Sequence, residues 1–575
     1  MKLTGFLFAA ALLGSCTQPA AEENYTRHVD PKIGTGGHGH VFVGANVPFG
    51  LVQVGPTSIP QTWDWCSGYH ASDSTVIGFS HTHLSGTGIG DLFDVTVMPV
   101  TGDVTYARGE EADPASGLWS YADRTQEIAR PGYYSVPLTR YGIRAELTAT
   151  ARVGLHRYTF PASDAAAVVF DLENGGCWDK ATETHLAKEG DRTVTGWRHS
   201  TGWAKDQRVY FAAEFSKPFE KFETIGDNYA RASFRTTDGE QVSLKVALSP
   251  VSVEGARENL AAELPGWDFE ETAKAADKAW NDELSKVKIE TADETARRIF
   301  YTALYHTMIA PSLFCDVNGD YYGSDHAIHR NADFTNYTTF SLWDTYRAAM
   351  PLMTVLHPEK MADIVQTMLT ISDEQGRLPV WHLWGNETDC MVGNPGIVAV
   401  ADAIVKGIGG FDREKAFEAI RKTAMNPDRG NGLRMEYGYI PCEMFNEAVA
   451  YDMEYALADG AAARAAETLG KAEDAKYFEE RSHSYRNYFD PATRFMRGRD
   501  SRKGWRTPFN AFASTHRADD YCEGNAWQYT WLAPHDVKGL EGLFGSRAKM
   551  IEKLDSLFTV SSVIEGGETS PDISG

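Results

Sequence analysis

The chain has 575 residues, of which 42% are hydrophobic and 23% charged, a mixture typical of a soluble protein with two to four domains. Its formal net charge is −24 and no basic stripe offsets that charge, so a polyanion would be repelled and nucleic acid is excluded as a partner. Aromatic residues make up 12% and include 14 Trp and 25 Tyr, which suits large cores and also flat surfaces for sugar rings.

Residues 1–24 are expected to be an export signal and a tether. Lys2 precedes an apolar run over residues 6–13 that is too short to span a bilayer, as in a signal peptide. The run ends in Leu-Gly-Ser-Cys, which resembles the lipobox of bacterial lipoproteins, with Cys16 as the lipidated residue. The alternative is an ordinary signal peptide with a chance cysteine. We therefore expect an exported lipoprotein, anchored to the outer membrane and facing the periplasm or the cell surface.

Residues 25–264 are expected to form an N-terminal β-sandwich. Short apolar runs alternate here with Gly, Pro, Asn and Asp, and strand candidates lie at residues 166–172, 208–215 and 241–248. The last of these shows the period-two alternation of a half-buried strand. Many such runs without long helical patterns favour two packed sheets.

Residues 265–290 are expected to be a linker helix that docks one domain on the other. Apolar residues recur there at spacings of three and four, which places them on one face of a helix. They are Phe269, Ala273, Ala276, Trp280, Leu284 and Val287.

Residues 291–575 are expected to be mostly helical and to form part of an α/α barrel. A capping-box pattern at residues 291–294 predicts the first helix. Its expected buried residues are Ile299, Phe300, Ala303, Leu304, Thr307 and Met308. Further helices are expected at residues 358–370, 397–407, 412–424, 446–469, 472–488 and 542–558. Their loops carry polar and aromatic clusters, which favours a site at one mouth of the barrel.

One cluster lies in the expected sandwich. Trp63 and Trp65 flank an aspartate, and either ring could stack on a sugar. His81 and His83 alternate on a strand and could share a metal, but two histidines without a third ligand are weak evidence for zinc. Hydrogen-bonding histidines are the favoured interpretation.

A second cluster spans residues 341–347 and 381–393 of the helical part. It combines stacking faces, carboxylates and an amide, which core filling alone does not explain. An aspartate that caps the following helix is the alternative for the first carboxylate. The candidate substrate-binding residues are Trp343, Asp344, Trp381, Asn386, Glu387 and Asp389.

The third cluster is Glu-Gly-Asn-Ala-Trp-Gln-Tyr at residues 523–529. A carboxyl among aromatic faces is partly desolvated, which raises its pKa and suits a general acid. Glu523 is therefore the candidate catalytic acid, with a helix-capping glutamate as the alternative. Gln528 offers a side-chain carbonyl oxygen that suits calcium, although an ordinary amide hydrogen bond also explains it.

Together these segments resemble glycoside hydrolase family 92, from Val-Asp-Pro-Lys-Ile-Gly-Thr-Gly at residues 29–36 to the end of the chain. The resemblance implies an exo-acting, inverting, calcium-dependent α-mannosidase with a β-sandwich, a linker helix and an (α/α)6 barrel. Glu523 matches the family's general acid. Trp343 and Asp344 match residues that hold the terminal mannose, the segment at residues 384–389 is expected to help, and Trp63 or Trp65 to wall the site. The expected substrate is a mannose-containing oligosaccharide or glycoprotein glycan.

One departure concerns the C-terminus. The family's base and part of its calcium site are expected in a later loop, which makes the barrel incomplete and the activity of this chain an open question. Two alternatives therefore stay open: a glycoside hydrolase of another α/α-barrel family, and a non-catalytic glycan-binding lipoprotein. The mannose linkage, with α-1,2 as the expectation, and the oligomeric state are not fixed by the sequence.

Overall fold

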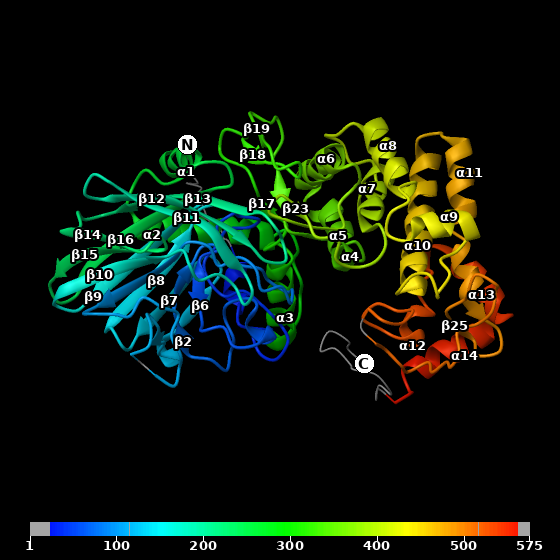
Figure 1. The fold of residues 1–575 in the computed structure, drawn as a ribbon, viewed down its shortest axis with the longest axis horizontal. Helices are drawn as coiled ribbons and strands as arrows, with labels where there is room; N and C mark the ends of the chain where they lie inside the picture. The colour runs from blue at the N-terminus through cyan, green and yellow to red at the C-terminus, as the bar shows by residue number, and fades with distance from the viewer. Residues whose placement is uncertain (1–22, 114, 516, 562–575) are drawn as a thin grey trace, which may run out of the picture.

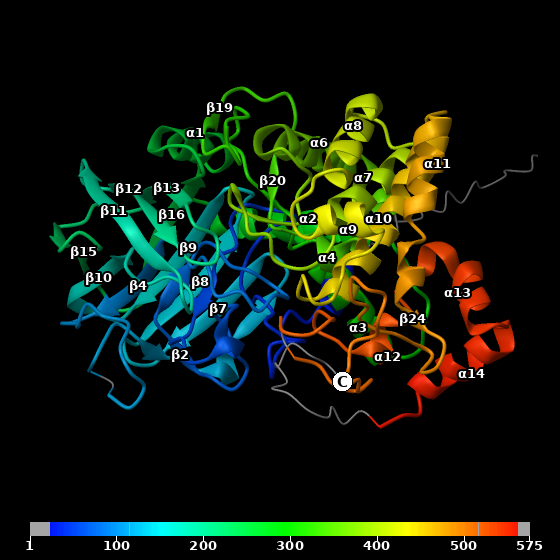
Figure 2. The ribbon, with the colours of Figure 1, turned by 45° about the vertical axis from the view of Figure 1, so that its right-hand side comes forward.

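The computed structural model describes residues 23–561, apart from residues 114 and 516. It contains a β-rich body followed by a helical body, and the two lie side by side in both views (Figures 1 and 2). This is the fold class that the sequence predicts. The predicted lipidation residue Cys16 and the tether up to residue 22 lie outside the described residues.

The β-rich body is a sandwich of two antiparallel sheets. The six-stranded sheet contains, in spatial order, β1 (Gly55–Thr57), β3 (Gly78–Ser80), β4 (Thr96–Thr101), β10 (Ser163–Asp171), β15 (Tyr229–Thr236) and β14 (Lys221–Ile225). The eight-stranded sheet contains β11 (Lys180–Glu189), β12 (Thr193–Thr201), β13 (Gln207–Phe215), β16 (Glu240–Ser249), β9 (Val153–Phe160), β8 (Ile143–Ala149), β7 (Tyr133–Leu138) and β6 (Ile128–Arg130). The three strands expected from the sequence are β10, β13 and β16.

The core of the sandwich lies between the facing sheets. Phe170 of β10 stacks on Phe211 of β13 with ring centroids 6.1 Å apart, and Phe215 of β13 meets the Phe170 ring edge-on at 6.1 Å. All three side chains are fully buried. Such interdigitating aromatic side chains, alternating along each strand, hold two sheets face to face.

Two helices lie on the eight-stranded sheet. Helix α1 (Val253–Glu263) contacts β16 and β13, and α2 (Phe269–Leu284) contacts β8 and β7. The apolar face predicted for the linker helix is confirmed at four positions that are buried in α2: Phe269, Ala276, Trp280 and Leu284. Ala273 is only half-buried, and Val287 lies beyond the end of α2. The sequence did not predict α1.

Helix α3 (Glu294–His306) corrects the sequence prediction in two respects. Its N-cap is Asp293, whose carboxylate accepts the backbone N–H groups of Thr295 and Ala296. The expected buried face is confirmed for Leu304 and Met308 but wrong for Ile299, which is 55% exposed, and for Ala303, which is also exposed. Tyr301 and Tyr305, which the prediction left out, are buried instead. The reason is aromatic docking: Trp280 of α2 lies 4.4 Å from Tyr305 between ring centroids, and the Tyr301 hydroxyl donates to the Val287 carbonyl at 3.0 Å.

The helical body continues with α4 (Leu342–Thr345), α5 (Ala349–Leu356), α6 (Pro358–Gln375), α7 (Pro395–Val405), α8 (Arg413–Ala424), α9 (Asn431–Tyr437), α10 (Ala448–Thr468), α11 (Ala472–Arg481), α12 (Ala526–Tyr529), α13 (Val537–Phe544) and α14 (Arg547–Leu557). Two expected helices are shorter than predicted. The helix at 472–488 ends at Arg481 and is followed by a 3-10 turn, and the helix at 542–558 breaks at Gly545, whose φ is +81°. Short β-ribbons separate the helices, among them β18 (Tyr321–Tyr322) with β19 (Ile328–His329), and β21 (Phe340–Ser341) with β22 (Trp381–Leu383) and β23 (Asn386–Glu387).

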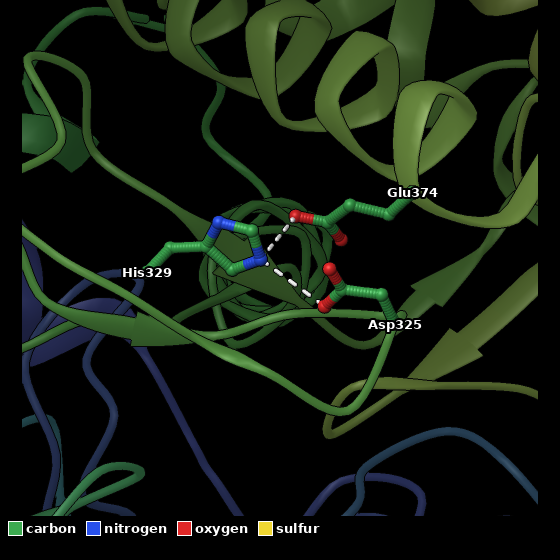
Figure 3. A group of neighbouring side chains, drawn as sticks. All are labelled: Asp325, His329 and Glu374. Carbon is green, nitrogen blue, oxygen red and sulfur yellow. Dashed lines mark hydrogen bonds and ion pairs between the residues drawn. The ribbon is translucent and has the colours of Figure 1, made fainter.

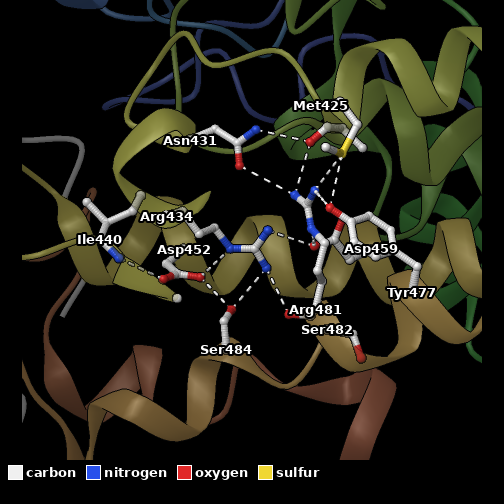
Figure 4. A network of polar contacts seen from close by, with 12 residues as sticks. Met425, Asn431, Arg434, Ile440, Asp452, Asp459, Tyr477, Arg481, Ser482 and Ser484 are labelled. Carbon is white, nitrogen blue, oxygen red and sulfur yellow. Dashed lines mark hydrogen bonds and ion pairs between the residues drawn. The ribbon is translucent and has the colours of Figure 1, made fainter. Parts of the chain in front are cut away.

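A buried ionic network ties α9, α10 and the end of α11 together (Figure 4). The Arg434 guanidinium donates to Asp452 at 2.8 Å and to Asp459 at 2.7 Å, both on α10. It also donates to the Arg481 carbonyl at 2.9 Å and to the Ser484 hydroxyl at 3.0 Å. Its side chain is 4% exposed, so its charge depends on these partners.

Among the described residues, no helix has both the length and the apolar character needed to cross a membrane.

Candidate active site

A pocket of about 560 Å³ lies where the sandwich meets the helical body. The sandwich contributes one wall through Trp203, in the loop between β12 and β13, and the other lining residues come from the helical body. They are Thr388, Asp389, Cys390, Met391, Glu443, Met444, Phe445, Asn446, Glu447, Tyr451, Arg517, Cys522 and Glu523. Four carboxylates and one guanidinium give the pocket an acidic character.

The backbone of this pocket is strained. Among the described residues, 17 non-glycine residues have positive φ. Five of them line this pocket: Asp389 (+54°), Met391 (+73°), Glu447 (+56°), Arg517 (+53°) and Glu523 (+46°). Left-handed backbone at non-glycine residues is unfavourable, and its concentration in one place is typical of a functional site.

Glu523, the predicted acid, lies in the loop directly before α12. The Tyr529 hydroxyl donates to the Cys522 carbonyl at 2.7 Å, and the Ser514 hydroxyl donates to the Gly524 carbonyl at 2.7 Å. The loop is therefore fixed on both sides of the carboxylate. The sequence placed this carboxylate among Trp527, Tyr529 and Trp531. Trp527 packs edge-on against Phe495, and the aromatic residues that line the pocket together with Glu523 are Trp203, Phe445 and Tyr451.

Glu447 is the second buried carboxyl of the pocket, and the sequence analysis did not single it out. The residue is 8% exposed, and its Oε1 has no hydrogen-bond partner. Burial raises the pKa of Glu447, against the opposing effects of a hydrogen bond with Cys522 and the charge of Arg517. It precedes α10, where the sequence showed only the start of a helix, so no pattern distinguished it from a surface glutamate.

Asp389 and Glu387 have different environments although they are two residues apart. Glu387 accepts the backbone N–H groups of Val380, Trp381 and Asp389 at 2.8, 3.0 and 3.0 Å. Burial alone would raise the pKa of Glu387, but Arg377 and these donors outweigh it, so the pKa lies below its usual value. Glu387 therefore anchors the loop, whereas Asp389 lines the pocket and pairs with Arg377.

Asn386 joins the two bodies. Its Oδ1 accepts the Asp206 N–H at 3.0 Å, and its Nδ2 donates to the Asp206 carbonyl at 2.9 Å and to the Trp384 carbonyl at 2.8 Å. Asp206 lies three residues after Trp203 in the same sandwich loop. The amide thus holds the pocket wall that the sandwich contributes.

Trp381 packs against Trp203 in the pocket wall that the sandwich contributes. It is 2% exposed and meets the Trp203 ring edge-on, with centroids 4.7 Å apart. Asp91 holds the backbone of the same loop by accepting the N–H groups of Trp203 and Ala204 at 2.9 Å each. Trp203 was not among the predicted residues, since a lone tryptophan between two strands carries no motif.

Trp343 and Asp344 lie on the short helix α4, beside the pocket but not among its lining residues. The Trp343 indole donates to Glu454 Oε1 at 3.0 Å, and the ring packs at the edge of the core cluster that contains Cys522 and Tyr529. Asp344 remains accessible to solvent, yet desolvation by the surrounding protein raises its pKa. Ser341 donates a hydrogen bond to its carboxylate.

Trp63 and Trp65 lie on a short 3-10 turn of the sandwich and do not line the pocket. The Trp63 indole donates to the Gly88 carbonyl at 2.9 Å, and the Trp65 indole donates to Asp73 at 2.7 Å. Both rings are only half-buried.

His81 and His83 are hydrogen-bonded core residues, as the favoured interpretation expects. Their Nδ1 atoms lie 2.6 Å from the Val95 carbonyl and 2.7 Å from the Gln53 carbonyl, respectively. Burial lowers their pKa values to about 3 and about 4. Among the described residues, the group of three or more His, Cys, Asp and Glu side chains close enough to share a metal is Asp325, His329 and Glu374, which lies outside the pocket.

Gln528 closes the first turn of α12. Its Oε1 accepts the Asn525 N–H at 2.9 Å in a reciprocal capping box, and the residue is exposed. A carbonyl oxygen has a second lone pair, but calcium needs six to eight oxygen ligands. The described residues around Gln528 do not by themselves provide such a set.

Comparisons with known proteins agree with this architecture. A solved α-mannosidase of family GH92 from Bacteroides thetaiotaomicron, in complex with mannoimidazole, is 39% identical with a TM-score of 0.91, over 94% of this chain and 75% of that one. A second solved structure from Bacteroides thetaiotaomicron, described as a family GH92 inverting mannosidase, is 29% identical with a TM-score of 0.85, over 94% of this chain and 74% of that one. A protein of Arthroderma benhamiae described as an uncharacterized secreted glycosidase is 26% identical, over 98% of this chain and 78% of its own length.

The family models divide the chain where its architecture changes. The glycosyl hydrolase family 92 N-terminal domain matches residues 28–249, which end with β16, and the catalytic domain matches residues 255–572. The chain therefore belongs to glycoside hydrolase family 92 and is a glycoside hydrolase of that family.

Proposed function

We propose that the chain is an exo-acting α-mannosidase that removes terminal mannose from glycans with inversion of the anomeric configuration, with α-1,2-linked mannose as the preferred substrate. The observation that carries the proposal is Glu523, held in a fixed and strained loop of an acidic pocket that both bodies build. The similarity to two solved mannosidases, one of them described as inverting, supports the substrate class.

In this mechanism Glu523 is the general acid. An inverting glycosidase needs one carboxyl to protonate the leaving oxygen and a second to accept the proton of the attacking water on the opposite face of the sugar, with about 6.5–9.5 Å between the two. We assign Glu523 to the first role and no described residue to the second, so mannose release by the purified chain would show that the chain has its own base. The transition state carries positive charge on the sugar ring, so the carboxylates Asp389 and Glu443 of the pocket would stabilise it.

The other pocket residues would bind and orient the sugar. We assign Glu447 to a sugar hydroxyl, because its unpartnered Oε1 is buried and its raised pKa favours a proton that can be donated. Trp203 and Tyr451 offer stacking faces. Of the two carboxylates at residues 387 and 389, we assign Asp389 to substrate binding. Asn386, Glu387 and Trp381 would instead position the pocket wall that contains Trp203.

The remaining candidates stay proposals on the basis of the family resemblance. Trp343 and Asp344 would hold the terminal mannose, and Trp63 or Trp65, which do not line the described pocket, would wall the site from the sandwich. Calcium assistance is also proposed on this basis, with Gln528 as one candidate ligand. Because the described residues do not complete a calcium site, no step is assigned to the ion. Loss of activity with a chelator, restored by calcium alone, is the expected result.

Export is proposed from the signal pattern and from the relative described as secreted. Lipid attachment at Cys16, which would anchor the enzyme to the outer membrane, rests on the lipobox pattern alone. Mass spectrometry of the protein purified from membranes should find a diacylglycerol-modified Cys16 as the first residue, and an unmodified N-terminus after a different residue would contradict it.

The decisive experiment incubates the purified chain with α-1,2-linked mannobiose and calcium. NMR should detect mannose released first as the β-anomer, and an initial α-anomer would refute inversion. Glu523→Gln should lower kcat by about 10²–10⁴-fold while mannose still binds, because a general acid contributes about that much. Glu552→Gln, an exposed glutamate of α14, is the matched control and should leave kcat unchanged.

The same experiment separates the alternatives. Binding of mannobiose without turnover, unchanged in Glu523→Gln, would favour a non-catalytic glycan-binding protein. Hydrolysis of α-linked glucosides rather than mannosides would favour the activity of another α/α-barrel hydrolase.

A further inference from the structure

Asp325, His329 and Glu374 converge on one point of the helical body, outside the pocket (Figure 3). Asp325 and His329 come from the β18–β19 hairpin, and Glu374 comes from the last turn of α6. His329 Nε2 lies 3.1 Å from Asp325 Oδ1 and 3.3 Å from Glu374 Oε1. Two segments 45 residues apart (374 − 329) therefore bring one imidazole nitrogen and two carboxylate oxygens together.

One ring nitrogen faces two carboxylate oxygens here. His329 Nε2 is hydrogen-bonded to Asp325 Oδ1, and it also lies close to Glu374 Oε1, to which no hydrogen bond is formed. In a tetrahedral site with bonds of about 2.0–2.2 Å, the ligand atoms lie about 3.3–3.6 Å from one another. The two separations from His329 Nε2 are close to that spacing, and all three ligand atoms lie within 4.8 Å of one another, so the side chains would have to close in slightly on a shared cation.

The three side chains are held in place by neighbouring groups. The Tyr321 hydroxyl donates to Glu374 Oε1 at 3.0 Å, and the Ser324 N–H donates to Glu374 Oε2 at 2.7 Å. The Tyr321 ring also stacks on the His329 ring, with centroids 4.9 Å apart and planes at 9°. Such outer contacts orient metal ligands in proteins.

Gly323 leaves the space beside the cluster open. A Cβ atom at this position would lie 2.7 Å from both Asp325 Oδ1 and His329 Nε2. The φ of Gly323 lies outside the left-handed region, so the backbone conformation does not require glycine there. The space that a side chain would fill is next to the two proposed ligand atoms, so a larger residue at this position would crowd them.

We propose that Asp325, His329 and Glu374 bind one divalent transition-metal ion of the zinc class. The two carboxylates and a neutral imidazole balance the charge of the ion, and the nitrogen ligand favours zinc over calcium or magnesium. His329 and Asp325 are 34% and 37% exposed, which leaves room for a water ligand, while Glu374 is 6% exposed.

The ion would join the hairpin to the end of α6 and so stabilise the segment that leads to the pocket. Gln375, the residue after Glu374, contacts Glu387 at 3.4 Å, and Arg377 pairs with Asp389. The role is structural, because no atom of the cluster lines the pocket. The proposal does not depend on the mannosidase activity.

The test measures zinc binding to the metal-free protein by calorimetry and by equilibrium dialysis with elemental analysis. One zinc per chain is expected, with a higher thermal unfolding midpoint when zinc is present. His329→Gln and Glu374→Gln should each weaken zinc binding at least tenfold and abolish the shift of the midpoint. Asp325→Asn, at the most exposed ligand, should weaken zinc binding even if the other two variants fold poorly.

His483→Gln is the matched control. His483 Nε2 also lies near two carboxylates, 3.7 Å from Glu479 and 3.5 Å from Asp536, but Arg486 already pairs with Asp536 at 2.6 Å. This variant should bind zinc as the wild type does. Absence of stoichiometric zinc binding, or equal weakening in His483→Gln, would overturn the proposal and leave His329 as the centre of an ordinary ion-pair cluster.

Discussion

Replacing Arg434 by methionine should strongly destabilise the helical body. The substitution keeps a long side chain but removes the guanidinium that lies between Asp452 and Asp459, whose side chains are 0% and 2% exposed. Removing one partner of a buried ion pair costs about 3–5 kcal/mol, because the remaining charge loses its compensation.

The structure sets the expected value at the lower end of that range. Asp459 keeps the Arg481 guanidinium at 3.0 Å. Asp452 keeps the Ile440 N–H at 3.0 Å and the Tyr488 and Ser484 hydroxyls at 2.9 and 2.5 Å. We therefore expect a loss of about 3 kcal/mol in the free energy of unfolding.

Urea unfolding followed by circular dichroism measures this loss. Arg464→Met is the control, because Arg464 on α10 pairs with Glu467 and Glu479 at the surface and should cost less than about 1 kcal/mol. The double variant Arg434→Met/Asp452→Asn should recover about 1–2 kcal/mol by removing a charge left without its partner. A loss below about 1 kcal/mol in Arg434→Met, or no recovery in the double variant, would refute the reasoning.

Three further outcomes are expected. Asn386→Ala should raise KM for mannobiose more than it lowers kcat, because the Asp206 backbone in the pocket wall loses its amide partner. The same loss should lower the free energy of unfolding by about 2–3 kcal/mol. An unchanged KM would contradict the positioning role of Asn386. Glu447→Gln should retain most of the affinity for mannose, whereas Glu447→Ala should lose it. The affinity of the wild type should fall as pH rises through the raised pKa of Glu447, while that of Glu447→Gln should not change. Parallel dependence of affinity on pH in the wild type and Glu447→Gln would contradict this assignment. The pKa of His83 is about 4 in the folded protein and 6.5 in the unfolded chain. Its contribution to the free energy of unfolding is therefore complete above pH 6.5 and is lost as pH falls towards 4, by about 3 kcal/mol at most. A His83→Gln variant whose unfolding free energy depends on pH as that of the wild type does would contradict this expectation.

The large elements could be predicted because their side-chain patterns match their surroundings. The sequence of β16 alternates polar and apolar residues over residues 241–246, which suffices to predict a strand although residues 244–249 are all buried. Helix α2 has a continuous apolar stripe that docks on the sandwich. Helix α1 could not be predicted in this way, because its buried residues Gly255, Ala256 and Asn259 are small or polar. In α3 the prediction found Leu304 but missed Tyr301 and Tyr305, because tyrosines with satisfied hydroxyls take buried positions where the pattern expects aliphatic side chains.

The candidate site was only partly predictable for a different reason. The motifs brought Glu523 and Asp389 into the candidate set, and both line the pocket. Composition cannot indicate that the Glu387 carboxylate is occupied by three backbone N–H groups. It also cannot reveal Trp203 or Glu447, whose place in the pocket depends on tertiary packing between segments more than 200 residues apart.

The contribution of Trp203 from the sandwich has a consequence for protein engineering. The helical body transferred alone to another scaffold would lose part of the pocket, because the wall at Trp203 and its backbone support at Asp91 would remain behind. A chimera of two relatives would need the β12–β13 loop and the segment around Asn386 from the same parent. On the proposed function, the substrate preference of this chain therefore depends on a matched pair of loops, one from each body.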